Sequence, residues 1–259
     1  MSDSRVVLVT GGAAGIGCRI AERFAADGYG VHVCDIDADA TANFRAAHPD
    51  CTATVADIAL TDDVDRVFAD LEKSHGGLDV LVNNAGIAGP TAPTDEIDPD
   101  DWDRTIAVSL SGQFYCARKA IPLLRRRSGG SIINISSNAA FFGFPLRLPY
   151  TASKWALIGI TKTLAMELGV DGIRVNAVCP GSVNGPRIDR VIDKDAAERG
   201  TSPEEIRRIY ARQSSMRKFV SNEDVANLVH FLASDQGAMI SGQAIGVDGH
   251  TESLSNWLD

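Results

Sequence analysis

Short runs of apolar and β-branched residues alternate along the chain with longer stretches whose apolar residues recur at helical spacing. These runs lie at 6–9, 31–34, 52–55, 79–82, 130–137 and 173–178. After the first run, Ile16, Ile20 and Phe24 recur at every fourth position, as on the inner face of a helix. Because a strand without polar alternation is typical of a sheet buried on both faces, the pattern predicts an α/β fold with helices between parallel strands.

A glycine-rich turn joins the first apolar run to the helical stretch that follows it. The turn contains Gly11, Gly15 and Gly17 within residues 10–17. Glycines let the backbone come close to a pyrophosphate, and the free N–H groups at a helix N-terminus favour its charge. The turn therefore predicts a dinucleotide site, with a simple tight turn before a helix as the alternative.

Asp35 directly follows the second apolar run. A carboxylate at this position can accept hydrogen bonds from both adenosine ribose hydroxyls, and it would repel a 2′-phosphate. Ile36 and Asp37 come next, and the glycine-rich turn contains no basic residue. The sequence therefore predicts NAD(H) rather than NADP(H) as the cofactor. The alternative is that Asp35 only caps a helix.

Tyr150 and Lys154 lie four residues apart in a stretch that we expect to be helical from Tyr150 to about Gly169. At this spacing the two side chains share one helix face. An ammonium beside a phenol lowers the phenol pKa toward the range of a general base. Ser137 ends the run at 130–137, where its hydroxyl could reach the same reacting oxygen. Taken alone, the pair could equally be an exposed tyrosine beside a solvated lysine.

These motifs together resemble the short-chain dehydrogenase/reductase family. Three motifs occur in the order typical of the family: the glycine spacing, the Asn-Asn-Ala-Gly of residues 83–86, and the serine before Tyr-x-x-x-Lys. The resemblance extends over residues 6–249. It implies one dinucleotide-binding domain over residues 1–259, an α/β fold of Rossmann type. The expected sheet is doubly wound, seven-stranded and mostly parallel, with helices on both faces. The segment at about 184–218 corresponds to the substrate lid of the family.

The resemblance also implies a role for each site residue. Tyr150 would take the alcohol proton, Lys154 would lower the phenol pKa and bind the nicotinamide ribose, and Ser137 would hydrogen-bond the substrate oxygen. The cofactor-binding residues that it implies are Gly11, Gly15, Ile16, Gly17, Asp35, Ile36, Asp57, Ile58, Asn84, Ala85, Gly86, Tyr150, Lys154, Pro180, Gly181 and Val183.

One position departs from the family pattern. Ser109 stands where the family usually has an asparagine, in a single helix expected from about Asp101 to Arg126. This asparagine supports a water that relays protons to the lysine, so the substitution leaves the relay open. The expected function is an NAD(H)-dependent oxidoreductase that acts on a secondary alcohol or its ketone. The alternative is a catalytically inactive nucleotide-binding sensor on the same fold.

Composition limits the partners. The net charge of −9 argues against nucleic acid or an anionic membrane as the main partner. No apolar run approaches the roughly 20 residues of a membrane span. The five cysteines are scattered, and the five histidines lack metal-ligand spacing. We therefore expect a cytoplasmic protein with a small-molecule substrate and no metal.

Two further patterns in the sequence concern assembly and substrate. Ala152, Ala156, Gly159 and Thr163 form a stripe of small residues in the helix that begins near Tyr150. In the family this helix joins subunits, so a homotetramer or homodimer is expected. The alternative is ordinary packing within one chain.

Three arginines could meet an anionic substrate, namely Arg147, Arg187 and Arg190. Solvation on exposed helix faces is the alternative for all three.

Overall fold

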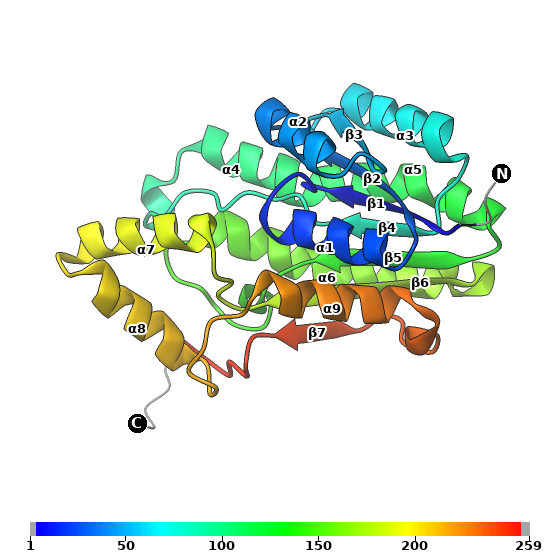
Figure 1. The fold of residues 1–259 in the computed structure, drawn as a ribbon. Coiled ribbons are helices and arrows are strands. Elements are labelled where there is room, and N and C mark those ends of the chain that lie inside the picture. The colour runs from blue at the N-terminus through cyan, green and yellow to red at the C-terminus, as the bar shows by residue number, and fades with distance from the viewer. Residues whose placement is uncertain (1–3, 255–259) are drawn as a thin grey trace.

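The computed structural model describes residues 4–254 as a central sheet with helices on both faces (Figure 1). The strands are β1 (Val6–Thr10), β2 (Gly30–Asp35), β3 (Thr52–Val55), β4 (Val80–Asn83), β5 (Gly130–Ile135), β6 (Ile173–Pro180) and β7 (Ala244–Val247). They lie in the order β3-β2-β1-β4-β5-β6-β7, and every neighbouring pair is parallel. The expected doubly wound sheet of seven strands is confirmed, and it is parallel throughout.

The two faces of the sheet carry two separate hydrophobic cores. In β1, Val7 and Val9 pack with the helices α1 (Gly15–Ala26), α2 (Ala38–Ala47) and α9 (Asn222–Ala233). Leu8 between them faces the opposite way.

The second core lies under the helices α3 (Thr61–His75), α5 (Gly112–Arg126) and α6 (Leu148–Leu168), and Leu8 packs into it. Side chains of a strand point alternately to its two faces, and both faces are covered here. This is why the strand sequences are apolar without alternation.

The helix expected over about 101–126 is interrupted, which corrects the sequence prediction. The chain forms α4 (Pro99–Ile106), then a π-helical turn (Ala107–Ser111), and then α5. Within the turn, Ser109 accepts a hydrogen bond from the Ile87 N–H (3.2 Å), so its hydroxyl is tied to the segment after β4. A π turn contains an extra residue, and such turns occur frequently at functional sites.

Two helices extend the molecule beyond the sheet at the left of Figure 1, namely α7 (Pro186–Arg199) and α8 (Pro203–Gln213). They enclose a small core of their own that contains Ile192, Ala196 and Ile206. Short 3₁₀ turns occur at Thr94–Glu96, Asn138–Ala140, Gly169–Asp171 and Asp235–Gly237. Among residues 4–254, no helix is both long enough and apolar enough to cross a membrane.

Candidate active site

A cleft of about 460 Å³ lies at the carboxyl ends of the strands. This edge is where a doubly wound sheet binds its ligands, because the strand–helix loops open there. Most of the site residues expected from the sequence line the cleft, namely Gly11, Gly15, Ile16, Gly17, Asp35, Asn84, Ala85, Gly86, Ser137, Tyr150, Lys154, Pro180, Gly181 and Val183. Segments far apart in the chain therefore meet at one place.

Three expected cofactor residues do not line this cleft. Ile36 is largely exposed, and Ile58 is buried in the core beneath α3 and α5. Asp57 forms an ion pair with Arg104 of α4 at 2.8 Å, so its carboxylate is already engaged by a neighbouring helix. Contacts of these three residues with the cofactor remain predictions.

The glycine-rich turn presents bare backbone to the cleft. Gly11 and Gly15 have φ values of 59° and 55°, in the left-handed region that favours glycine. A Cβ on Gly17 would lie 2.1 Å from the Gly11 carbonyl oxygen, so no side chain fits there. At Gly15 nothing lies within 4 Å of such a Cβ, which means that this backbone borders open space. A cradle of this kind at the N-terminus of α1 fits the pyrophosphate of a nicotinamide dinucleotide.

Asp35 faces the cleft from the end of β2. Its two carboxylate oxygens accept hydrogen bonds from the N–H groups of Ala13 and Asp37, each at 3.2 Å. The residue that caps α2 is Asp37, whose side chain accepts from the Ala40 N–H at 2.9 Å. The capping alternative for Asp35 is therefore wrong, and its carboxylate is held in place at the mouth of the cleft.

Tyr150 and Lys154 lie in the first two turns of α6, on the same face as expected. The Lys154 Nζ lies 5.7 Å from the centre of the Tyr150 ring. The lysine is buried, and its ammonium donates to the Ile135 carbonyl oxygen at 2.8 Å. Ser137 follows β5 and begins a 3₁₀ turn in which its Oγ accepts from the Ala139 N–H. One strand end and one helix therefore position all three polar side chains.

The charges around Tyr150 favour its phenolate. Burial alone would raise the pKa of Tyr150, but the nearby charges of Lys154, Arg187 and Arg147 and a hydrogen bond with Ser137 outweigh burial, so its pKa is lowered. Burial also lowers the pKa of Lys154, against the opposing effect of Tyr150. This arrangement can accept a proton from an alcohol oxygen and return it.

Ser109 remains close to the lysine despite the missing asparagine. Its Oγ and the Lys154 Nζ each lie 3.5 Å from the position that a Cβ on Gly86 would take. The π-helical turn brings the serine hydroxyl beside Gly86, next to which the buried ammonium also lies. A hydroxyl can both donate and accept a hydrogen bond, as a proton relay requires.

Sequence reasoning did not identify Tyr210 and Gln213 of α8, which also line the cleft. No motif distinguishes them, since they lie on an amphipathic helix of the segment at 184–218. Burial raises the pKa of Tyr210, so this phenol stays protonated at neutral pH. Arg147 lines the cleft as well, and the sequence alone could not separate it from an ordinary surface arginine.

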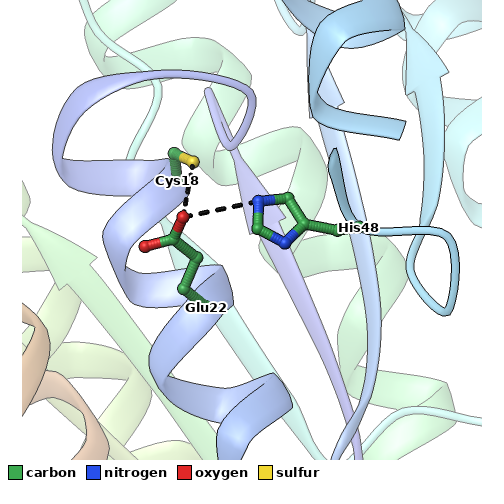
Figure 2. Close-up of side chains that lie close together, drawn as sticks. All are labelled: Cys18, Glu22 and His48. Atoms are coloured by element: carbon green, nitrogen blue, oxygen red, sulfur yellow. Dashed lines mark hydrogen bonds and ion pairs between the residues drawn. The ribbon is translucent and has the colours of Figure 1, made fainter. Parts of the chain in front are cut away.

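A second polar cluster lies away from the cleft, on α1 and just after α2 (Figure 2). The Glu22 carboxylate contacts the Cys18 thiol at 3.7 Å and the His48 Nε2 at 3.4 Å. Its other oxygen accepts from Arg19 at 2.8 Å. Burial, with the Glu22 charge, raises the pKa of Cys18 to about 11. The three groups thus satisfy one another, and they are one donor short of a structural zinc site.

Comparisons with known proteins agree with this geometry. Residues 11–250 match a family described as "Enoyl-(Acyl carrier protein) reductase". D-beta-hydroxybutyrate dehydrogenase from Rhizobium meliloti is 32% identical, covering 95% of this chain and 98% of that protein.

Two solved structures are similar over nearly their whole length. An actinorhodin polyketide ketoreductase with NADPH has a TM-score of 0.90 at 32% identity, covering 95% of this chain and 97% of the other. A NAD⁺-bound xylitol dehydrogenase has a TM-score of 0.90 at 26% identity, covering 95% and 98%. The chain therefore belongs to the short-chain dehydrogenase/reductase family, whose members are oxidoreductases that bind a nicotinamide cofactor.

Proposed function

We propose that the protein is an NAD(H)-dependent oxidoreductase that interconverts a secondary alcohol and its ketone. The observation that carries the proposal is the pairing of Tyr150 with the buried Lys154 in the cleft that also holds the glycine-rich turn. A phenol with a lowered pKa next to a dinucleotide cradle suits removal of a proton from an alcohol.

Each polar side chain has one task in this proposal. Tyr150 takes the proton from the alcohol oxygen during oxidation and returns it during reduction. Lys154 stabilises the phenolate through its charge, and Ser137 hydrogen-bonds the substrate oxygen. A bound nicotinamide supplies the hydride acceptor or donor, and the protein aligns it with the substrate.

Asp35 supports the choice of NAD(H). Its carboxylate would bind the adenosine ribose hydroxyls and would repel a 2′-phosphate. The glycine-rich turn would hold the pyrophosphate. Asn84, Ala85, Gly86, Pro180, Gly181 and Val183 would contact the nicotinamide half. The two similar structures carry different nucleotides, so the choice depends on Asp35.

The test is a spectrophotometric assay at the nicotinamide absorbance band, with a panel of secondary alcohols, sugars and hydroxy acids and either NAD or NADP. We expect turnover with NAD and a lower kcat/KM with NADP. Binding of NADH without turnover of any substrate would instead favour the inactive sensor. A preference for NADP would contradict the cofactor assignment alone.

The remaining parts of the proposal concern assembly and location. The exposed apolar side chains of Phe114 on α5 and of Trp155 and Met166 on α6 support a homotetramer or homodimer through these helices. Residues 1–259 would form one domain, with residues 184–218 as its lid. The five cysteines have free thiols, as in a protein of the reducing cytoplasm.

A further inference from the structure

Arg147 is the least expected group in the cleft. It is 9% exposed and begins α6 three residues before Tyr150. One of its terminal nitrogens donates to the Ala88 carbonyl oxygen at 3.0 Å, whereas its Nε has no hydrogen-bond partner. An arginine keeps its charge in a protein, and a buried charged donor without a partner is costly. The structure therefore contains a cationic N–H group that lacks an acceptor.

A second arginine, Arg187, lies close to the same phenol. The guanidinium carbons of Arg147 and Arg187 lie 5.2 Å and 5.9 Å from the centre of the Tyr150 ring. Arg187 is exposed at the start of α7 and forms no ion pair within residues 4–254. By contrast, Arg190 is exposed and donates to the Pro186 carbonyl oxygen of its own helix. The three candidate arginines of the sequence are thus not equivalent.

The cleft itself provides no counter-charge for these two arginines. Among the described residues, the one carboxylate that lines it is Asp35, at the end of β2. Two strands separate β2 from β5, which leads to Ser137 and the reacting phenol. The charge of Asp195 acts on Arg147, but Asp195 forms no ion pair with it, and its Oδ1 is held by Arg199 at 2.7 Å. The substrate half of the cleft therefore carries excess positive charge.

We propose that the substrate is a short α- or β-hydroxy acid and its oxo acid, whose carboxylate is bound by Arg147 and Arg187. This inference rests on the proposed oxidoreductase function. The planar guanidinium fork matches a carboxylate, and such a ligand supplies the acceptor that the Arg147 Nε lacks. Both arginines lie within 6 Å of the ring that carries the reacting oxygen, so the carboxylate and the carbinol carbon lie close together in the substrate.

The experiment compares matched substrates. Short hydroxy acids are assayed with NAD beside their own methyl esters, and glycerol phosphate is assayed beside glycerol. We expect the acids to exceed their esters in kcat/KM by about 100-fold, the scale of a close charge pair in a binding site. Equal rates for acids and esters would overturn the inference and leave the proposed function intact. A stronger preference for the phosphate would also overturn it.

Variants then assign the effect to individual residues. Arg147→Gln and Arg187→Gln each remove a charge that lowers the Tyr150 pKa, so both substrates should react more slowly. The acid should in addition lose at least 10-fold in kcat/KM relative to its ester, while Arg147→Lys should keep part of the preference. Arg208→Gln is the matched control, since Arg208 is exposed on α8 and pairs with Glu205. A purely structural role of Arg147 would lower both rates together, so an unchanged acid-to-ester ratio would contradict the assignment.

A binding measurement decides the inference even if no compound is turned over. Malonate is titrated by calorimetry into the protein saturated with NADH. Saturable binding of malonate that is weakened at least 10-fold in Arg187→Gln supports a carboxylate site. This substitution is at an exposed position, so the variant should keep the fold. Absent binding, or binding that is the same in both proteins, overturns it.

Discussion

At the scale of single residues, the chemistry depends on one phenol in an unusual setting. Tyr150 is surrounded by Lys154, Arg147 and Arg187, and their charges lower its pKa although burial opposes this. Ser137 adds a hydrogen bond from the end of β5. A tyrosine in water loses its proton only near pH 10, so this setting is what makes the side chain a usable base.

Removal of the Tyr150 hydroxyl tests this directly. Tyr150→Phe keeps the ring but removes the group that exchanges the proton. We expect kcat to fall by about 1,000-fold or more, because general acid–base catalysis contributes about 100- to 10,000-fold. Fluorescence titration should show unchanged affinity for NADH. Tyr29→Phe is the control, since Tyr29 packs against Phe24 of α1 away from the cleft. If Tyr150→Phe retained its activity, the proposed role of Tyr150 would be contradicted.

Asp35 governs the nucleotide preference. Asp35→Ser removes the charge that would repel a 2′-phosphate and leaves a short hydroxyl toward the ribose. The ratio of kcat/KM for NAD to that for NADP should fall by about 100-fold, as expected when a site built for hydroxyl recognition loses its acceptor. Asp37→Ser is the control, because it removes the same charge as Asp35→Ser and keeps a capping side chain for α2. Its ratio of kcat/KM for NAD to that for NADP should stay near that of the wild type.

At the scale of elements, local spacing in the sequence predicted the helix α6, whereas long-range packing produced a break in a helix that the sequence did not predict. The i, i+4 pair of Tyr150 and Lys154 lies within one helix, and α6 begins two residues earlier than predicted. The interruption of the helix at Ala107–Ser111 has another origin, since its Ser109 bonds to Ile87 on a different segment. A helical pattern in the sequence carries no sign of such a contact.

The packing of β2 and β3 with α3 makes stability dependent on pH. His32 is buried, and its two ring nitrogens contact the hydroxyls of Thr52 at 2.7 Å and Thr54 at 3.2 Å. Thr52 also bonds to His75, and Thr54 donates to Asp70. Burial, together with His75, lowers the pKa of His32 to about 4 from the ordinary 6.5. The folded protein therefore holds His32 neutral where the unfolded chain would protonate it.

From this difference we predict a loss of stability in weak acid. Between pH 6.5 and 4 the unfolded state binds more protons at this position, so the free energy of unfolding falls as the pH falls. The contribution of His32 between pH 7 and pH 5 is about 2 kcal/mol. Denaturant unfolding at both pH values measures it. His32→Gln should be less stable at pH 7 and should lose this part of the pH dependence; an equal pH dependence in both proteins would contradict the assignment.

At the scale of the whole molecule, the proposed assembly would use the exposed faces of α5 and α6. Trp155 and Met166 on α6 and Phe114 on α5 remain accessible in the single chain. Exposed apolar side chains mark subunit contacts where they form a contiguous patch, which is the arrangement proposed for these helices. The residues that line the cleft within 4–254 come from several elements of this one chain.

Light scattering tests the assembly. We expect a mass of two or four times the 27.5 kDa chain for the wild type. Trp155→Glu should shift the protein toward the monomer, because it places a charge in the proposed contact. Met239→Glu is the control, since Met239 is also exposed but lies outside α5 and α6. A wild-type protein that is monomeric at micromolar concentration would contradict the proposed assembly.

The sequence by itself determined the alternation of helices and strands, the glycine-rich turn and the pairing of Tyr150 with Lys154. These features depend on residues close together in the chain, where apolar periodicity and fixed spacing dictate which side chains share a face.

The tertiary structure alone decided which polar side chains are buried, paired or left without a partner. Asp57 pairs with Arg104, Arg147 is buried beside Tyr150 with an unpartnered Nε, and Tyr210 reaches the cleft from α8. Each of these facts depends on segments that only the folded sheet brings together, and burial changes the energy of a charge far more than its neighbours in the sequence do. The substrate is inferred from these residues for that reason.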